Sequence, residues 1–532
     1  MKLKKMIWPV LFILYYSAVL LKSSSIWLSS DLAGTFLNAI VALREGRLIP
    51  YGFNYTSIAG FQSHLILMPI LYRITNSVWV SFLLHNVILE SLVMVSAYYL
   101  AKALGASNRA ALLVLAFLAL PFSNFLVDMH VVSQFYSLQF LCILVSLGVY
   151  FSIEKYTRLR LFLGVISVGI LCFLQGLNGN RYLSFFFLPF LCTVVFQIYT
   201  ERKNFSLKKL FVAISCTIGS VLGYLCFVFY IKKNYSTYDF SMATVNEYAS
   251  PHSMFNELIN SVYAYLDFFG GKFSGVELTS FDGLFQFTAL LFAAFLILVL
   301  VYSYKNIRKN YKPCFYVVVF SLFSLLINNV LCLVLDETVF SARYDYLSLL
   351  PLFMCLILYI EKLGLRAFIN KRFINFAFVL LFAIYTIFCQ VSVIRLPSSN
   401  DQIACINSNN DFLIANNCHF AYASYWHANV STVRSELNVE YAALNDVLLG
   451  EGKFAPWFGG MPREYYKDDY HEGVTAIVLT NQENAIAAAN LPQQDHIINT
   501  YSNNMYVVYL YDVDPFNFEA DLYQYAKLPS DG

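Results

Sequence analysis

Charge is scarce in this chain, and its scarcity limits the class of protein. Only 13% of the 532 residues are charged and 58% are hydrophobic, whereas a soluble domain carries about 25% charged residues. This composition excludes an ordinary soluble protein. The region after residue 395 has 17 acidic side chains against 5 basic ones, a net charge of −12. An acidic surface repels phosphate backbones, so the composition also argues against nucleic-acid binding.

The sequence also lacks the common signatures of soluble enzymes. No Walker loop, Rossmann glycine fingerprint, HExxH motif or Ser-His-Asp signature occurs. Nine of the eleven cysteines lie in or beside apolar stretches, where they act as small hydrophobic side chains. Cys405 and Cys418 lie in the C-terminal region, where an oxidising compartment would permit a disulfide between them. Two free thiols are the alternative. Zinc has no support, because no histidine lies at ligand spacing from these cysteines.

Long apolar stretches dominate what is present. A helix that crosses a bilayer needs roughly 20 apolar residues. About eleven stretches approach or reach this length, at residues 7–23, 78–101, 110–127, 134–152, 160–176, 182–199, 209–231, 284–303, 314–335, 345–361 and 373–394. The sequence therefore predicts an all-α polytopic membrane protein.

Positive charge alternates between the connections. Every second short connection is rich in Lys and Arg: residues 2–5, 102–109, 155–160, 202–209, 305–312 and 362–372. The positive-inside rule places these connections, and the N-terminus, in the cytoplasm. We therefore expect a multi-pass protein of a bacterial inner (plasma) membrane, with the other loops and the C-terminal region on the periplasmic or extracellular side.

The composition changes from apolar to mixed at LPSSND, residues 396–401, which indicates a boundary between two domains. We expect a transmembrane region at residues 1–395, with long outward loops at 24–77 and 232–283, and an extracytoplasmic α/β domain at 396–532. In the second domain HFAYASYW, TAIVLT and MYVVYLYD are typical of strands, and ENAIAAANL is typical of a helix. In the first loop, residues 31–46 show helical apolar spacing, which predicts an amphipathic helix at the membrane interface. The apolar segment at residues 60–74 predicts a second interfacial helix or a short membrane span.

Asp31 begins the predicted amphipathic helix, a few residues after the first span. A carboxylate at the boundary between lipid and water can act as general base on a substrate hydroxyl. The alternative is that Ser29, Ser30 or Asp31 only caps the helix. Asp128 is a second acid expected at the outer surface, and His130 follows it as a substrate-binding candidate. Two converging carboxylates could share acid, base or metal-binding roles; an ordinary loop residue is the other reading of Asp128.

Several cations could bind an anionic group at the outer surface. Arg181 lies in a short turn between glycines, a setting that suits phosphate; an interfacial anchor is the alternative. Arg343 and its neighbour Tyr344 precede the tenth span, where Arg343 could bind phosphate or pair with Asp345. Lys232 and Lys233 follow the seventh span on the outside and could bind a lipid headgroup, or serve as anchors.

Trp426 lies in the C-terminal domain, in the aromatic segment YASYWHANV. Aromatic faces beside amides are typical of sugar-binding surfaces, although packing within the domain is the commoner explanation.

The arrangement resembles the GT-C superfamily of membrane glycosyltransferases. The matching features are the early outward acid in SSDLAG (Asp31), the large first loop, the acid in DMH (Asp128), the turn GLNGNRYL with Arg181, and the segment RYDYL with Arg343. A C-terminal outer domain is common in this superfamily. Many members carry a pair of acids near the first loop. Here Leu32 follows Asp31, so the chain departs from that pattern and does not offer two adjacent acids for a metal ion at this position.

The resemblance implies transfer of a sugar from a polyprenyl-phosphate donor to an acceptor outside the cytoplasm, with inversion at the anomeric carbon. Asp31 would be the general base, Asp128 would position the acceptor or a cation such as Mg²⁺ or Mn²⁺, and Arg181 and Arg343 would hold the leaving phosphate. We expect a surface glycan such as the O-antigen of lipopolysaccharide as acceptor. A flippase or transporter for lipid-linked saccharides, a polymerase and a non-catalytic scaffold are the alternatives.

Overall fold

The chain forms two compact units, each assembled from segments that are far apart in the sequence. The structure, a computed structural model, describes residues 29–55, 64–119, 136–235, 250–271, 275–334, 345–363, 372–395, 400–445, 447–448, 452–467 and 470–518. Unit 1 comprises Met1–Ser23, Ile88–Phe227 and Met242–Leu396. Unit 2 comprises Ser24–Val87, Val228–Ser241 and Pro397–Gly532.

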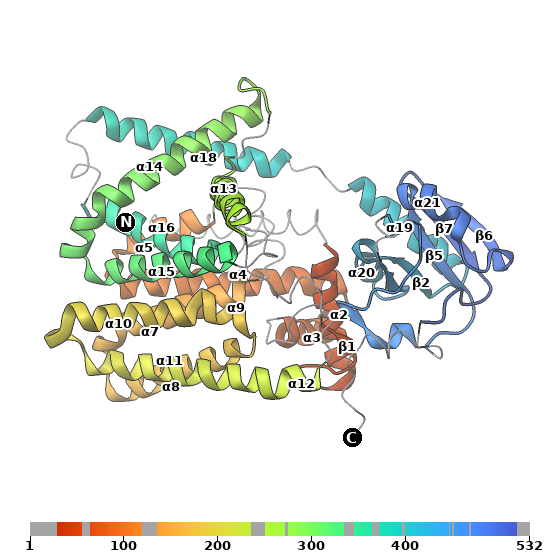
Figure 1. Cartoon of the computed structure of the whole chain (residues 1–532), viewed down its shortest axis with the longest axis horizontal. Helices are drawn as coiled ribbons and strands as arrows, with labels where there is room; N and C mark the ends of the chain where they lie inside the picture. Colours follow the sequence, from red (N-terminus) through yellow and green to blue (C-terminus); the bar gives the residue numbers. More distant parts are fainter. Residues whose placement is uncertain are drawn as a thin grey trace. The chain divides into compact units, whose positions relative to one another are not determined.

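Unit 1 is a bundle of apolar helices (Figure 1). Its main helices are α4 (Val78–Ala103, which begins in unit 2), α5 (Asn108–Leu118), α7 (Ser137–Ser152), α8 (Arg158–Gly176), α10 (Leu188–Glu201), α11 (Leu207–Cys226), α13 (Pro251–Phe268), α14 (Phe281–Asn310), α15 (Lys312–Val334), α16 (Tyr346–Leu363) and α18 (Arg372–Arg395). Within the described residues, seven helical segments are long and apolar enough to cross a membrane, and shorter apolar helices accompany them. The predicted polytopic helical class is confirmed.

Helices cover ten of the eleven predicted apolar stretches, one of them (110–127) only over its described first half. The stretch 7–23 lies outside the described residues. Most helix ends lie within a few residues of the predicted ends, because apolar runs are long and their flanks carry charge or turn residues. Helix α14 is an exception, since it continues to Asn310, seven residues past the predicted end.

Helices α8 and α11 pack closely because glycine lets their backbones approach. A Cβ atom added to Gly219 would lie 2.2 Å from the carbonyl oxygen of Gly169, and one added to Gly223 would lie 2.2 Å from that of Phe173. Small residues at helix contacts are the usual means of close packing in membranes, where the hydrophobic effect does not drive helices together. Figure 1 shows this pair at the lower edge of unit 1.

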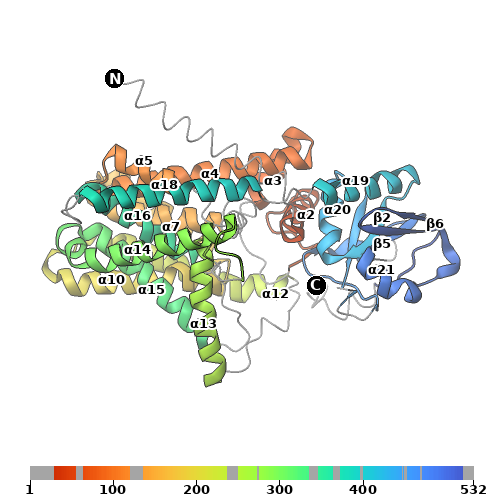
Figure 2. The same cartoon turned by 90° about the horizontal axis from the view of Figure 1, so that it is seen from above.

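Unit 2 contains a five-stranded sheet in the order β3-β2-β5-β7-β6. The strands are β2 (Phe420–Ser424), β3 (Glu440–Leu444), β5 (Thr475–Thr480), β6 (Ile497–Ser502) and β7 (Tyr506–Tyr511). β2 runs parallel to β3 and β5, whereas β7 runs antiparallel to β5 and β6. Helices α19 (Asn400–Ala415) and α21 (Asn481–Ala487) cover opposite faces of the sheet (Figure 2). The predicted small α/β domain is confirmed.

The predicted strands TAIVLT and MYVVYLYD are β5 and β7, and the predicted helix begins as α21. The strand predicted over HFAYASYW is shorter than expected. It ends at Ser424, and Tyr425 and Trp426 begin helix α20 (Tyr425–Arg434). Alternating apolar and aromatic residues continue across this boundary, so the pattern alone did not mark the turn from strand to helix.

The first outward loop belongs to unit 2 together with the C-terminal residues. It supplies α2 (Ser30–Glu45), β1 (Phe53–Asn54) and α3 (His64–Thr75), and β1 pairs antiparallel with β4 (Met461–Pro462). The predicted helix at 31–46 is present as α2. Its apolar residues, such as Phe36 and Leu37, are buried because the helix packs against α3 and α20. The structure thus corrects the expected surface helix to a helix inside unit 2.

The predicted disulfide between Cys405 and Cys418 is wrong, since both are free, buried thiols. Cys405 lies within α19. The backbone N–H of Cys418 donates to the carbonyl of Leu413, eight residues or about 12 Å of helix beyond Cys405. A disulfide needs Cα atoms within about 7 Å of each other. The Cys418 thiol instead donates to the carbonyl of Phe420 at 3.1 Å.

Candidate active site

Asp31 lies in the first turn of α2, with an exposed side chain. The residue that caps this helix is Ser29, whose side chain accepts a hydrogen bond from the backbone N–H of Leu32 at 3.3 Å. Asp31 is therefore not needed as the cap, and its carboxylate is available for another role. The N-terminus of a 16-residue helix also stabilises a negative charge at this position.

Tyr425 holds the Asp31 carboxylate. Its hydroxyl donates to Oδ1 of Asp31 at 2.6 Å, across 394 positions of sequence. Burial, with a smaller contribution from the Asp31 charge, raises the pKa of Tyr425 above its ordinary value. The phenol therefore stays protonated and remains a donor at neutral pH. The bond fixes one carboxylate oxygen of Asp31, and within the described ranges no hydrogen bond engages the other oxygen, Oδ2.

The close approach of α2 to α20 makes this bond possible. The hydroxyl of Ser30 donates to the carbonyl of Tyr425, and the amide of Asn429 donates to the carbonyl of Ser30 at 3.3 Å. A Cβ atom added to Gly34 would lie 3.1 Å from Nδ2 of Asn429 and 3.2 Å from the carbonyl oxygen of Gly460. Glycine at position 34 thus allows a contact that a larger residue would crowd.

Two indole rings pack against Tyr425, the hydrogen-bond partner of Asp31. The ring centroid of Tyr425 is 5.3 Å from that of Trp426 and 5.3 Å from that of Trp457. Trp426 is 57% exposed, whereas Tyr425 is buried. Tyr425 thus contacts both an exposed indole and the Asp31 carboxylate; an exposed aromatic face of this kind suits a sugar ring.

Lys232 and Lys233 are exposed at the end of the apolar segment Leu207–Asn234. In the same unit the rings of Tyr51 and Tyr235 stack at 4.8 Å, and the guanidinium carbon of Arg47 lies 4.4 Å from the Tyr51 ring centroid. Cations and tyrosine hydroxyls therefore occur together in this part of unit 2, which is the chemistry that binds a phosphate group.

Arg181 is exposed in α9 (Asn180–Tyr182) of unit 1. The glycines beside it have packing and conformational reasons of their own. Gly179 has φ of +70° and a Cβ atom there would meet the Phe227 ring at 2.8 Å, while one at Gly176 would lie 2.8 Å from the carbonyl oxygen of Ser220. The predicted phosphate role of Arg181 therefore depends on the guanidinium alone and not on these glycines.

Asp345 forms a buried polar cluster in unit 1. The hydroxyl of Tyr265 donates to its Oδ2 at 2.6 Å, and the amides of Asn328 and Asn329 donate at 3.4 and 3.3 Å. Asp345 is fully buried, and no basic side chain pairs with it in the part of the chain that the structure describes. The cluster joins α13, α15 and the start of α16.

The other predicted site residues, Asp128, His130, Arg343 and Tyr344, lie outside the described residues, so their roles stay predictions. Over the described ranges, no group of three or more His, Cys, Asp or Glu side chains could hold a metal ion. Around Asp31 these ranges supply one carboxylate and a tyrosine hydroxyl. These residues do not fit a cation site, and we derive no step through a cation.

The sequence analysis did not identify Tyr425 as the partner of Asp31, nor Asp345 as the centre of a buried polar cluster. Tyr425 adjoins Trp426, which the aromatic segment singles out, but nothing local shows that it meets a residue almost 400 positions away. Asn328, Asn329 and Asp345 are polar residues in or beside apolar stretches, which is a recognised signal of a functional or structural cluster. That signal could have drawn attention to Asp345.

Comparison with solved structures identifies the fold. The crystal structure of ArnT from Cupriavidus metallidurans bound to undecaprenyl phosphate aligns with 94% of this chain and 98% of its own, at 12% sequence identity and a TM-score of 0.55. The apo state of that protein aligns with 95% and 98% of the two chains, at 12% identity and a TM-score of 0.54. An oligosaccharyltransferase from Archaeoglobus fulgidus gives a TM-score of 0.47 at 12% identity, over 97% of this chain and 74% of its own.

No protein-family model and no curated protein sequence matches the chain. The likeness to ArnT nevertheless extends over almost the full length of both chains. The chain therefore shares the fold of ArnT over almost its full length, which is the GT-C fold that the resemblance implies.

Proposed function

We propose that this protein is a membrane glycosyltransferase that moves a sugar from a polyprenyl-phosphate donor to an acceptor outside the cytoplasm. The observation that carries the proposal is the Asp31 carboxylate, which accepts a hydrogen bond at 2.6 Å from Tyr425, in a chain with the GT-C fold. The ring of Tyr425 also packs against the exposed indole of Trp426. The fold by itself does not define an activity. A carboxylate held in this way supplies the base that such a transfer needs.

In the proposed reaction Asp31 accepts the proton of an acceptor hydroxyl. The acceptor oxygen attacks the anomeric carbon of the sugar, and the bond from that carbon to the phosphate oxygen breaks. The electron pair leaves with the polyprenyl phosphate, which departs as an anion. One displacement of this kind inverts the configuration at the anomeric carbon. Tyr425 acts by orienting the carboxylate, so that Oδ2 faces the acceptor.

The departing phosphate gains negative charge, and cations would stabilise it. We assign this task to Arg181 and Arg343, with Lys232 and Lys233 as binding residues for the donor headgroup. ArnT from Cupriavidus metallidurans crystallised with undecaprenyl phosphate bound, which supports a lipid phosphate as the donor carrier here. His130 and Tyr344 remain candidate substrate-binding residues in this proposal.

The acceptor we propose is a surface glycan, such as O-antigen, in a bacterial inner membrane protein whose unit 2 faces outward. Trp426 supports a glycan acceptor, because its exposed ring lies 5.3 Å from the ring of Tyr425, which binds Asp31. A hexose ring that stacks on this indole would present a hydroxyl near the carboxylate. The alternating positive charge of the cytoplasmic connections supports the orientation.

The proposal is tested by the mass of surface glycan in cells that lack the protein, cells with the native chain, and cells with Asp31→Asn at equal expression. Asp282→Asn is a matched control, because Asp282 is likewise an exposed acid in the first turn of a helix. The native chain and the control should both add a hexose-sized mass, and Asp31→Asn should add none.

Two results would overturn the proposal. If Asp31→Asn adds the same mass as the native chain, Asp31 is not the base. If loss of the protein removes whole polymer or strands lipid-linked precursor in the inner leaflet, the protein is a polymerase or a flippase.

A further inference from the structure

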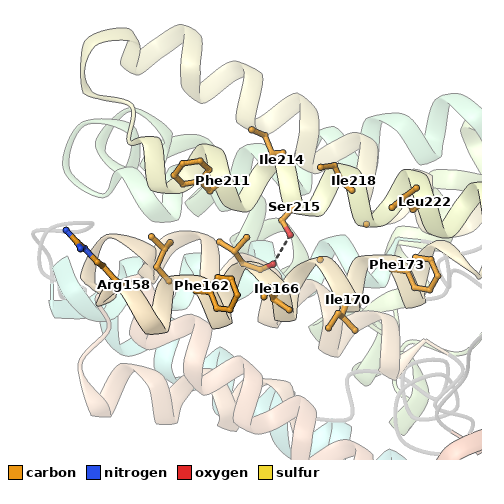
Figure 3. A pocket seen from close by; sticks show the side chains of 14 residues that line it. Arg158, Phe162, Ile166, Ile170, Phe173, Phe211, Ile214, Ser215, Ile218 and Leu222 are labelled. Atoms are coloured by element: carbon orange, nitrogen blue, oxygen red, sulfur yellow. Dashed lines mark hydrogen bonds between the residues drawn. The ribbon is translucent and has the colours of Figure 1, made fainter.

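A long apolar groove runs between α8 and α11 within unit 1 (Figure 3). Its volume is about 660 Å³. Both helices belong to segments that are long and apolar enough to cross a membrane. None of the residues that line the groove takes part in the proposed transfer.

The floor of the groove is low because two glycines form it. Gly169 and Gly219 bring the two backbones into contact below the groove, since a Cβ atom added to Gly219 would lie 2.2 Å from the carbonyl oxygen of Gly169. The Ser215 hydroxyl, which also lines the floor, donates to the carbonyl of Val165 at 2.7 Å, so its hydrogen-bonding capacity as a donor is used. The floor therefore presents a nearly apolar surface to an occupant.

The walls of the groove are large apolar side chains from both helices. Phe162 and Ile170 of α8 are 61% and 54% exposed, and Ile218 and Leu222 of α11 are 54% and 52% exposed. In Figure 3 these side chains stand in two rows along the groove. Two such rows on either side of the glycine floor form an open apolar groove.

One end of the groove carries a positive charge. Arg158 lines this end, and Phe173 lines the other (Figure 3). Arg158 is exposed, and in the described part of the chain no hydrogen bond or ion pair engages its guanidinium. Lys208, by contrast, donates to the carbonyls of Glu154 and Tyr156. Arg158 is thus the cation available to a ligand in the groove.

The length of the groove suits a lipid of one leaflet. From Arg158 to Phe173 the helix rises about 22 Å, which exceeds the roughly 15 Å depth of half a hydrocarbon core. An acyl chain that enters beside Arg158 therefore finds apolar contacts along its whole length. A phosphate above that chain would lie at the guanidinium, to which it can bond in a forked geometry.

We propose that this groove binds an anionic glycerophospholipid, with one acyl chain between α8 and α11 and the phosphate on Arg158. Since the positive-inside rule places the connection before α8 in the cytoplasm, the lipid belongs to the cytoplasmic leaflet. The amount of lipid bound to α8 and α11 would then depend on the fraction of anionic lipid in the membrane. The site is independent of the proposed glycosyl transfer.

The test uses the full-length protein in nanodiscs with palmitoyl-oleoyl phosphatidylglycerol and the matching phosphatidylcholine in equal amounts. Lipids that stay bound after transfer to detergent are counted by native mass spectrometry. Arg158→Gln should lower retained phosphatidylglycerol about fivefold, the loss expected for one surface cation. Arg160→Gln is the control, because Arg160 is also exposed but does not line the groove.

A second pair of variants tests the groove itself. Ile218→Trp fills the groove and should lower retention of phosphatidylglycerol by a similar factor. Val221→Trp is its control, since Val221 is 41% exposed on the same helix but lies outside the lining. Thermal melting of each variant confirms that it is folded.

Three results would overturn the inference. The native protein could retain both lipids equally, in which case the charge has no role. Arg158→Gln and Ile218→Trp could match their controls, in which case the lipid binds elsewhere. Protein purified from its native membrane could carry a polyprenyl phosphate that both Arg158→Gln and Ile218→Trp remove. In that case the groove binds a polyprenyl phosphate and not a glycerophospholipid.

Discussion

The bond between Tyr425 and Asp31 can be removed by deletion of one oxygen atom. Tyr425→Phe keeps the ring and its contacts with Trp426 and Trp457 but loses the donor to Asp31. A hydrogen bond to a charged group contributes about 1.5–3 kcal/mol. Asp31 is exposed, and water can replace the lost donor, so the lower end applies. That value corresponds to a loss of about tenfold in turnover.

The assay measures transfer of labelled sugar from a polyprenyl-phosphate donor to surface glycan, with the donor varied so that kcat and KM separate. Because Tyr425 orients the base and does not contact the donor, we expect kcat to fall and KM for the donor to stay near its native value. Activity is normalised to the folded fraction of each preparation.

Tyr422→Phe provides a matched control in the same domain. Its hydroxyl also donates to a carboxylate, that of Asp514, at 2.9 and 3.0 Å, and its ring is buried. Both variants should lose about 1.5 kcal/mol of stability, but only Tyr425→Phe should lose kcat. Equal kcat values for the two variants would refute the idea that Tyr425 orients a catalytic base.

Two further predictions concern unit 1, and both are measured as thermal midpoints of the full chain in detergent. Asp345→Ala removes the acceptor that the Tyr265 hydroxyl and the amides of Asn328 and Asn329 share, while the Asn329 amide keeps its bond to the Leu325 carbonyl. It should therefore lower the free energy of unfolding by about 1–3 kcal/mol; an unchanged midpoint would show that the cluster does not support the fold. Gly223→Ala places a Cβ atom 2.2 Å from the carbonyl oxygen of Phe173 and should destabilise the protein strongly. Gly164→Ala should cost much less, because its Cβ atom would meet only side chains, the nearest being the Tyr156 ring at 3.2 Å. Similar midpoints for the two glycine variants would contradict the packing of α8 on α11.

The helices of unit 1 could be predicted because the bilayer imposes a length and a composition on each one. The strands β5 and β7 could be predicted because apolar and aromatic residues that favour strands form short bounded runs. The position of Asp31 near the start of a helix was also readable, since Ser29 and the apolar spacing after it mark that start.

The partner of Asp31 could not be predicted, because it depends on how distant segments pack. Glycine at position 34 permits the approach of α2 to α20. A glycine within a helical pattern can have several other roles, so Gly34 alone does not indicate this contact. The packing of α2 inside unit 2 was missed for a similar reason. An apolar helical face shows that the helix is buried on one side, and whether lipid or protein covers that side depends on the whole fold.

The disulfide prediction was wrong because the expected compartment and the number of cysteines do not show how far apart two cysteines lie in the fold. Helix α19 carries Cys405 away from Cys418, and sequence distance alone does not show the direction of the chain.

The most direct test of the central claim follows the leaving group. Purified full-length protein in proteoliposomes is given a labelled polyprenyl-phosphate hexose and surface glycan from cells that lack the protein. Native protein should produce one polyprenyl phosphate for each hexose joined to glycan, and Asp31→Asn should produce neither. If the label stays on the lipid while the native protein moves it across the bilayer, or if Asp31→Asn transfers hexose at the native rate, the account is contradicted.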